Sequence, residues 1–197
     1  MTAGILAWAL ALAAAAPAPT EKIQALLAKP KVLCGRFEQS KQLVGLKKPV
    51  TSNGRFCVVA DKGVLWRALQ PFPNTFRLTR DEIVQMNGDR VARRLDARRE
   101  PALRMINNIL FSLFSGDLAQ LESLFDIKGG VRDGSWSVTL EAREPALAKA
   151  IGSVAMEGGT YVKNISISEA NGDRTKIAFS AIQTGDAAMS ADEAALF

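Results

Sequence analysis

The stretch that decides the fold runs from Gly54 to Thr79, GRFCVVADKGVLWRALQPFPNTFRLT. Turn-forming residues at 61–63 and 71–74 divide it into three runs, and in each run apolar residues occupy every second position. A period of two, interrupted by turn residues, predicts antiparallel strands with one apolar face. The alternating residues are Phe56, Val58 and Ala60, then Val64, Trp66 and Ala68, then Phe76 and Leu78. The function depends on what covers this face.

The composition indicates one globular domain. The chain has 197 residues, of which 48% are hydrophobic and 23% charged, enough apolar material for a sizeable core. The formal net charge of +5 fits a protein that works near acidic lipids or acidic partners, and it fits equally a surface charged for solubility.

Several classes of active site are excluded by residues that the sequence lacks. Histidine is absent, which removes the commonest general base and the commonest metal ligand. Two cysteines alone cannot form a four-ligand zinc site, and the paired glycines lack the spacing of a phosphate-binding loop. The conceivable catalytic acids Glu38, Asp61 and Asp81 form no recognisable pair. We therefore expect no enzyme, no cofactor and no metal.

The N-terminus resembles an export signal. Residues 2–18 carry no charged side chain, and the apolar run from Ile5 to Ala16 is shorter than the ~20 residues that span a bilayer. A short apolar core followed by small residues is typical of a cleaved secretory signal. We expect a signal peptide over 1–16 and a single domain over 17–197; an uncleaved anchor or a misassigned start codon are the alternatives.

The two cysteines fall on strands that we expect to be neighbours. The run from Val32 to Lys41 begins the sheet, and Cys34 and Cys57 lie almost equally far from the loop centre near Gly45. In an oxidising compartment a disulfide between them is plausible, and two small buried thiols are the alternative. Direct pairing would also place Arg36 beside Arg55.

Further elements follow from periodicity and capping signals. An amphipathic helix is predicted over 20–29, with Thr20 as its cap. A strongly apolar helix is predicted over 101–115, and it includes Ile106, Leu110 and Phe114. A second short helix is expected from Asp117 to Phe125, with helical turns over 145–151. Strands are expected at 81–95 as a hairpin, at 135–143, and at 160–168 and 175–183 as a hairpin around Asn171-Gly172.

These elements predict an α+β fold: one curved antiparallel sheet whose concave apolar face is covered by helices. That face contains no titratable side chain, so it suits an acyl chain better than a reaction. Its predicted lining residues are Phe37, Phe56, Val58, Val64, Trp66, Phe76, Leu78, Trp136, Val138 and Leu140.

Residues 20–95 resemble the outer-membrane lipoprotein carrier family, the LolA-like proteins. The resemblance is carried by the runs FEQSK, SNGRF, GVLWR, QPFP and FRLTRDEIV. They match the family's F-x-Q strand, its Gly-x-Phe/Leu strand, its tryptophan strand and the following proline. Here those positions are Phe37 with Gln39, Gly54 with Phe56, Trp66, and Pro71 or Pro73.

The resemblance implies an incomplete β-barrel closed by helices, with residues 101–115 as the lid. It implies a periplasmic carrier that takes a lipidated passenger from an inner-membrane ABC transporter and delivers it to an outer-membrane receptor. We expect a monomer that binds no nucleic acid. Well-known members hold the lid with an arginine that precedes a proline, whereas Ala60 and Asp61 stand at those positions here. The alternative is a regulatory or sensor module of related fold that binds a membrane-anchored protein.

Overall fold

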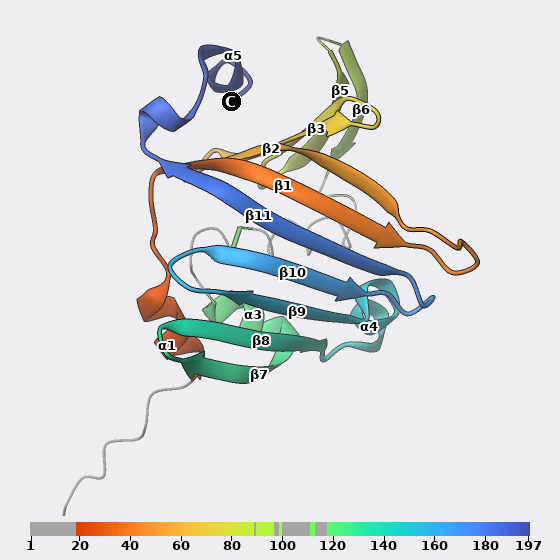
Figure 1. The fold of residues 1–197 in the computed structure, drawn as a ribbon, viewed down its shortest axis with the longest axis vertical. Coiled ribbons are helices and arrows are strands. Elements are labelled where there is room, and N and C mark those ends of the chain that lie inside the picture. Colours follow the sequence, from red (N-terminus) through yellow and green to blue (C-terminus); the bar gives the residue numbers. More distant parts are fainter. Residues whose placement is uncertain (1–18, 89, 97–98, 100–110, 113–117) are drawn as a thin grey trace, which may run out of the picture.

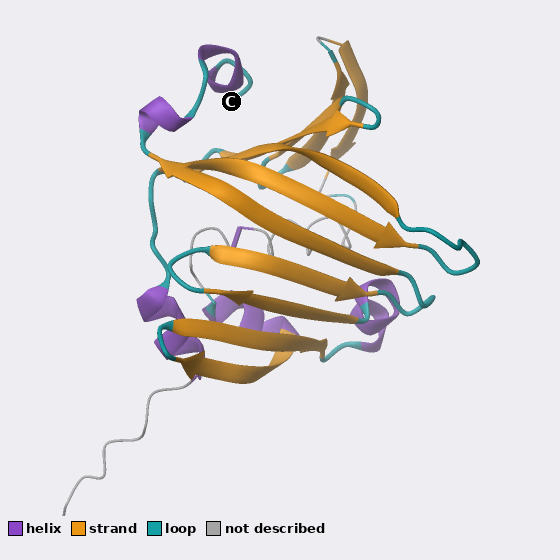
Figure 2. Cartoon of the chain, viewed as in Figure 1, coloured by secondary structure: helices purple, strands orange, loops and turns teal. Residues whose placement is uncertain are grey.

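Eleven strands form one antiparallel sheet in the computed structural model, which describes residues 19–88, 90–96, 99, 111–112 and 118–197 (Figures 1 and 2). The strands are β1 (Val32–Gln42), β2 (Val50–Val59), β3 (Gly63–Gln70), β4 (Asn74–Leu78), β5 (Glu82–Asn87), β6 (Arg90–Asp96), β7 (Phe125–Arg132), β8 (Ser135–Ala142), β9 (Ser153–Gly158), β10 (Val162–Ser168) and β11 (Arg174–Thr184). The described helices are α1 (Pro19–Leu26), α3 (Ala119–Leu124), α4 (Pro145–Ile151), the 3-10 turn η1 (Asp186–Ala188) and α5 (Ala191–Ala194).

The sheet consists of two meanders joined by the pairing of β1 with β11. Its strand order is β6-β5-β4-β3-β2-β1-β11-β10-β9-β8-β7, so β6 and β7 form its two edges and the sheet does not close into a barrel. The predicted antiparallel sheet is confirmed. The predicted covering helix over 101–115 lies outside the described residues except for Phe111 and Ser112, so Ile106, Leu110 and Phe114 are not described.

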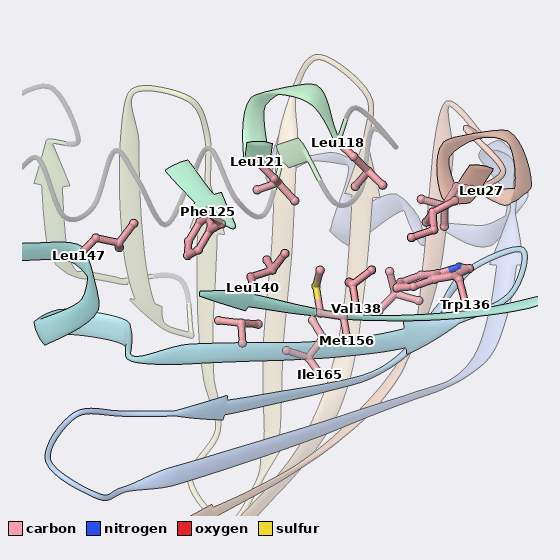
Figure 3. Close-up of a cluster of buried hydrophobic side chains, with 13 residues drawn as sticks. Leu27, Leu118, Leu121, Phe125, Trp136, Val138, Leu140, Leu147, Met156 and Ile165 are labelled. Carbon is pink, nitrogen blue, oxygen red and sulfur yellow. The ribbon is translucent and has the colours of Figure 1, made fainter. Parts of the chain in front are cut away.

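The part of the sheet formed by β7, β8 and β9 is covered by helices. Figure 1 shows α1, α3 and α4 grouped beside β7, β8 and β9. Leucines from these helices pack on the same face of the sheet as Leu140 and Trp136, and Phe125 is completely buried between them (Figure 3). The hydroxyl of Thr20 in α1 donates a hydrogen bond to Glu122 in α3, which ties two of the helices together. This end of the molecule is a closed hydrophobic core.

The opposite face of the sheet is covered by the end of the chain. After β11 the backbone turns back through η1 and α5, and Figure 1 shows α5 beyond β1 and β2, away from the other helices. Met189, Leu196 and Phe197 pack there against a buried cluster that contains Val32 and Leu65. We call this segment, residues 185–197, the C-terminal tail. The packing of this tail was not predicted from the sequence.

Most predicted elements are present, with some changes of boundary. The Gly54–Thr79 stretch forms β2, β3 and β4, although β2 begins earlier, at Val50. The helix expected to reach Phe125 ends at Leu124, and Phe125 begins β7. Thr20 lies inside α1 and bonds to Glu122, so the prediction that it caps this helix is wrong. In the described part of the chain, no helix combines the length and the hydropathy needed to cross a membrane.

Candidate functional site

The candidate site is the face of β1, β2 and β3 that carries Phe37, Phe56 and Trp66, which we call the inner face. Each phenylalanine lies opposite a glycine on the neighbouring strand: Phe37 pairs with Gly54, and Phe56 with Gly35. A Cβ on Gly54 would come within 2.8 Å of the Phe37 ring, and one on Gly35 within 2.9 Å of the Phe56 ring. The rings therefore lie flat against backbone that only glycine leaves open.

The aromatic rings form one cluster. Phe37 and Trp66 are stacked, with ring centroids 3.8 Å apart and planes 25° apart. Phe179 of β11 makes T-shaped contacts with Phe56 and with Trp66, and the ring centroids are 5.0 Å and 6.1 Å apart, respectively. Offset and edge contacts of this kind favour packing beyond the simple burial of area. Phe179 was not among the predicted lining residues.

The ten predicted lining residues lie on one face, but in two clusters. Side chains opposed in an antiparallel pair point to the same face, and Ile177, Ile165 and Met156 follow one another across β11, β10 and β9. Ile177 and Phe179 contact both clusters and so join them. Phe37, Phe56, Val58, Val64, Trp66 and Leu78 belong to the first cluster; Phe76 lies opposite Trp66; Trp136, Val138 and Leu140 belong to the second.

The two clusters differ in what covers them. Trp136, Val138 and Leu140 are buried under α1, α3 and α4, and the Trp136 ring nitrogen donates to the Gly159 carbonyl at 2.8 Å. None of the helices that the structure describes packs on the β1–β4 cluster. Between the clusters, beside Leu27 and Phe56, lies a cavity of about 20 Å³. That volume holds about one water molecule and no acyl chain.

The lid arginine of the resembled family has no counterpart at Ala60. That residue is exposed in the turn between β2 and β3. A different arginine contacts the segment predicted as the lid: Arg80, in the turn between β4 and β5, places its guanidinium 5.5 Å from the centre of the Phe111 ring. A guanidinium over an aromatic face at this distance is a cation–π contact. Both turns lie at the same end of the sheet because the strands form a meander.

Behind the aromatic cluster, on the outer face, the two cysteines lie directly opposite each other. Cys34 and Cys57 form a disulfide with their Cα atoms 4.1 Å apart, and the same register places Arg36 beside Arg55. Glu193 of the tail completes the only group of three potential metal ligands found among the described residues. With both sulfurs in the disulfide, that group offers no thiolate to a metal.

Glu193 anchors the tail. It is 2% exposed, and it accepts a hydrogen bond from Arg55 Nε at 2.7 Å while exchanging hydrogen bonds with Ser190 in a capping box. Burial by itself would raise the pKa of Glu193, but the bond from Arg55, the bonds from Ser190 and the guanidinium charge together hold that pKa below its usual value. Arg55 also donates to the Ala188 carbonyl, and Arg77 to the Leu196 carbonyl at 3.2 Å.

The conceivable catalytic acids are not brought together. Glu38 lies on exposed β1 surface, whereas Asp61 and Asp81 lie in the β2–β3 and β4–β5 turns. Residues 175–183 were predicted as a strand, but Phe179 and Ile182 of this strand were not predicted to line the inner face. The tail was missed although the Ser190-x-x-Glu193 pattern is a capping-box signal.

Comparison with known families gives one match over nearly the whole chain. The family described as "Outer membrane lipoprotein carrier protein LolA-like" matches residues 12–197. No curated protein matches the sequence directly.

The solved structures that match this chain share little sequence with it. A LolA superfamily protein from Nitrosomonas europaea has a TM-score of 0.44 at 6% identity, covering 85% of this chain and 92% of its own. A putative outer membrane lipoprotein-sorting protein domain from Vibrio parahaemolyticus has a TM-score of 0.44 at 9% identity, covering 87% and 92%. The MucA/MucB complex from Pseudomonas aeruginosa has a TM-score of 0.43 at 14% identity, covering 82% and 56%. Similarity at this level indicates nothing about ligands or partners of this chain.

Proposed function

This chain belongs to the LolA-like family of outer membrane lipoprotein carrier proteins, and on that premise we propose that it carries acyl chains of lipoproteins or related lipids on its inner face. The proposed route is periplasmic, from an inner-membrane ABC transporter to an outer-membrane receptor, after removal of residues 1–16. In this proposal the protein is a monomer that catalyses no reaction and needs no cofactor.

The observation that carries the proposal is the continuous apolar cluster that Phe37, Phe56 and Trp66 form on the inner face. Its aromatic rings and the valines around them offer no charge that would oppose an acyl chain. Each methylene group transferred from water to such a surface contributes ~0.8 kcal/mol, so a long chain gains several kcal/mol.

A carrier must also release its acyl chain, so the contacts that hold the predicted lid closed should be only moderately strong. The contact of Arg80 with Phe111 is of suitable strength, because an exposed cation–π pair contributes about 0.5–1 kcal/mol. We propose that Arg80 performs here the holding role that the family assigns to the arginine replaced by Ala60.

The test is uptake of a fluorescent fatty acyl probe by the purified protein. Trp66→Asp places a charge in the cluster and should lower the affinity for the probe at least about tenfold. Ala178→Asp is the matched control, since Ala178 is exposed on the outer face of β11 and the same charge there should leave uptake unchanged. Equal uptake by both folded variants, or no uptake by the wild type, would refute the carrier proposal.

The second candidate is a regulatory module that binds a membrane-anchored protein and moves no lipid. The close stacking of Phe37 on Trp66 and the small volume of the adjoining cavity favour it, since a filled face needs no ligand. Purification from native envelope distinguishes the two. Lipid in the extract, identified by mass spectrometry, supports the carrier; one stoichiometric protein partner without lipid supports the module.

A further inference from the structure

Most of the large exposed apolar side chains in the described part of the chain lie where the strands end on one side of the sheet. Each of the antiparallel turns β1–β2, β3–β4 and β5–β6 lies at that end, by strand order and direction. Scattered exposed apolar residues are ordinary, but a gathering of them marks a surface that binds something. Of the large exposed hydrophobic residues in the described part of the chain, all but Val131 lie there: Val44, Leu46, Val50, Leu69, Phe72 and Val91.

The β1–β2 loop, residues 43–49, reaches farthest from this end. Gln70, the last residue of β3, pairs with Asn53, whereas the β1–β2 pairing continues to Val50 opposite Lys41. Three further residues of extended strand amount to roughly 10 Å. Figure 1 shows this loop projecting beyond the neighbouring strands. Its side chains are therefore the first that a large flat surface would meet.

The loop is held in one conformation by contacts at its base. The Gln42 side chain donates to the carbonyls of Leu43 at 3.1 Å and Leu46 at 2.6 Å. The Val44 amide donates to Asp173 in the β10–β11 turn at 2.9 Å, and Lys41 pairs with Glu169 of the same turn at 2.8 Å. An anchored backbone thus holds Val44 68% exposed and Leu46 49% exposed. The exposure is a property of the folded loop.

Positive charge accompanies the apolar side chains. Lys47 and Lys48 follow Leu46 directly, both are exposed, and neither has an ion-pair partner in the part of the chain that the structure describes. The two carboxylates of the β10–β11 turn that contact the base of the loop are already engaged, Glu169 by Lys41 and Asp173 by the Val44 amide. Apolar side chains beside unpaired lysines suit the boundary between anionic headgroups and acyl chains.

We propose that the β1–β2 loop is a membrane-docking tip that binds the surface of an anionic phospholipid bilayer. Val44 and Leu46 enter the headgroup region, and Lys47 and Lys48 contact lipid phosphates. Long lysine side chains keep their charged ends among the headgroups while the neighbouring residues go deeper. Docking goes beyond the proposed carrier function, since it needs no ligand on the inner face.

The test is co-sedimentation with phospholipid vesicles. Protein is recovered from cells that express the full chain, and mass spectrometry verifies that all compared variants share one N-terminus. Wild-type protein should bind vesicles of phosphatidylcholine mixed with phosphatidylglycerol, and bind pure phosphatidylcholine more weakly. The double variant Val44→Asp, Leu46→Asp should lower the partition coefficient by about tenfold or more. Lys47→Glu with Lys48→Glu should remove the preference for phosphatidylglycerol and its salt dependence.

Val131→Asp is the matched control, because Val131 is an exposed apolar residue at the opposite end of the sheet. It should bind vesicles as the wild type does. Circular dichroism and the unfolding midpoint verify that each variant is folded, and uptake of the acyl probe, which should stay unchanged, separates docking from the carrier function. Vesicle binding by Val44→Asp, Leu46→Asp equal to that of the wild type, or no binding by the wild type, would overturn the docking proposal whatever the probe result.

Discussion

The β7–β10 part of the sheet and the β1–β4 part present apolar side chains on the same face, yet they bury them differently. Phe125 and Leu140 are sealed under α1, α3 and α4, so this part is a core in the ordinary sense. Phe37 and Phe56, which are 1% and 2% exposed, lie opposite glycines and pack in the aromatic cluster with Trp66 and Phe179. On the outer face of this second part, the disulfide and the C-terminal tail pack against the sheet.

Under the proposed function, this difference separates stability from binding. A core sealed by helices cannot admit a ligand without unfolding those helices, because close-packed interiors have little free volume. A cluster fixed from its outer face can expose its inner face while the strands stay in register. The two parts should therefore respond differently to equivalent changes.

The largest expected effect comes from equivalent truncations in the two parts. Phe125→Ala and Phe37→Ala remove the same side chain from sites that are 0% and 1% exposed. Each should lower the free energy of unfolding by about 3–5 kcal/mol, measured by denaturant titration. Only Phe37→Ala should also change acyl probe uptake by the folded fraction. Altered uptake in Phe125→Ala would contradict the claim that only the β1–β4 part takes up the probe.

Removal of the disulfide should weaken the β1–β4 part. Cys34→Ser with Cys57→Ser opens a closed loop of 23 residues and should cost about 3 kcal/mol of stability. Thiol titration of the unfolded, unreduced wild type should find no free thiol, and two free thiols would contradict the pairing. Hydrogen exchange should increase in β1–β3 and stay unchanged in β7–β9.

Loss of the buried carboxylate should release the tail. Glu193→Gln keeps the side-chain shape but replaces a charge-assisted hydrogen bond from Arg55, at a cost of about 1–2 kcal/mol. Because folding lowers the pKa of Glu193, its contribution is fully present above the unfolded pKa of about 4.3 and is lost as pH falls through the lower folded pKa.

At pH 7 the wild type should have a larger free energy of unfolding than Glu193→Gln, and this difference should shrink on acidification to pH 3. Denaturant titration of both proteins at the two pH values measures it. A difference that stays constant over that range would show that the carboxylate charge does not hold the tail.

The smallest expected effect is at Arg80. Arg80→Ala removes the cation–π contact with Phe111 and should speed release of the acyl probe about two- to fivefold, with little change in stability. Arg132→Ala, an exposed arginine of β7, is the control and should leave release unchanged. Stopped-flow dilution of the loaded protein measures both rates.

Local sequence patterns were sufficient for much of the fold. The alternation in Gly54–Thr79 predicted β2, β3 and β4, and the alternation in 135–143 predicted β8, because a period of two is set by strand geometry alone. The short β9 was not predicted, since six residues with one valine and one methionine give a weak signal.

The candidate site was predictable only as a list of residues. The sequence placed the ten lining residues on one apolar face, and the register of the sheet agrees. It could not divide them into two clusters, because the helices that pack on Trp136 come from distant parts of the chain. Nor could it find Arg80 beside Phe111, a contact between residues that lie 31 positions apart.

The sequence by itself determined the antiparallel strands, the apolar face and the family, since these depend on residue type and spacing along one chain. Only the tertiary structure decided that α1, α3 and α4 pack on Leu140 and Trp136, that Cys34 lies opposite Cys57, and that Glu193 meets Arg55 across 138 residues. It also decided that Val44 and Leu46 stand exposed on an anchored loop, because exposure depends on what the remainder of the chain leaves uncovered.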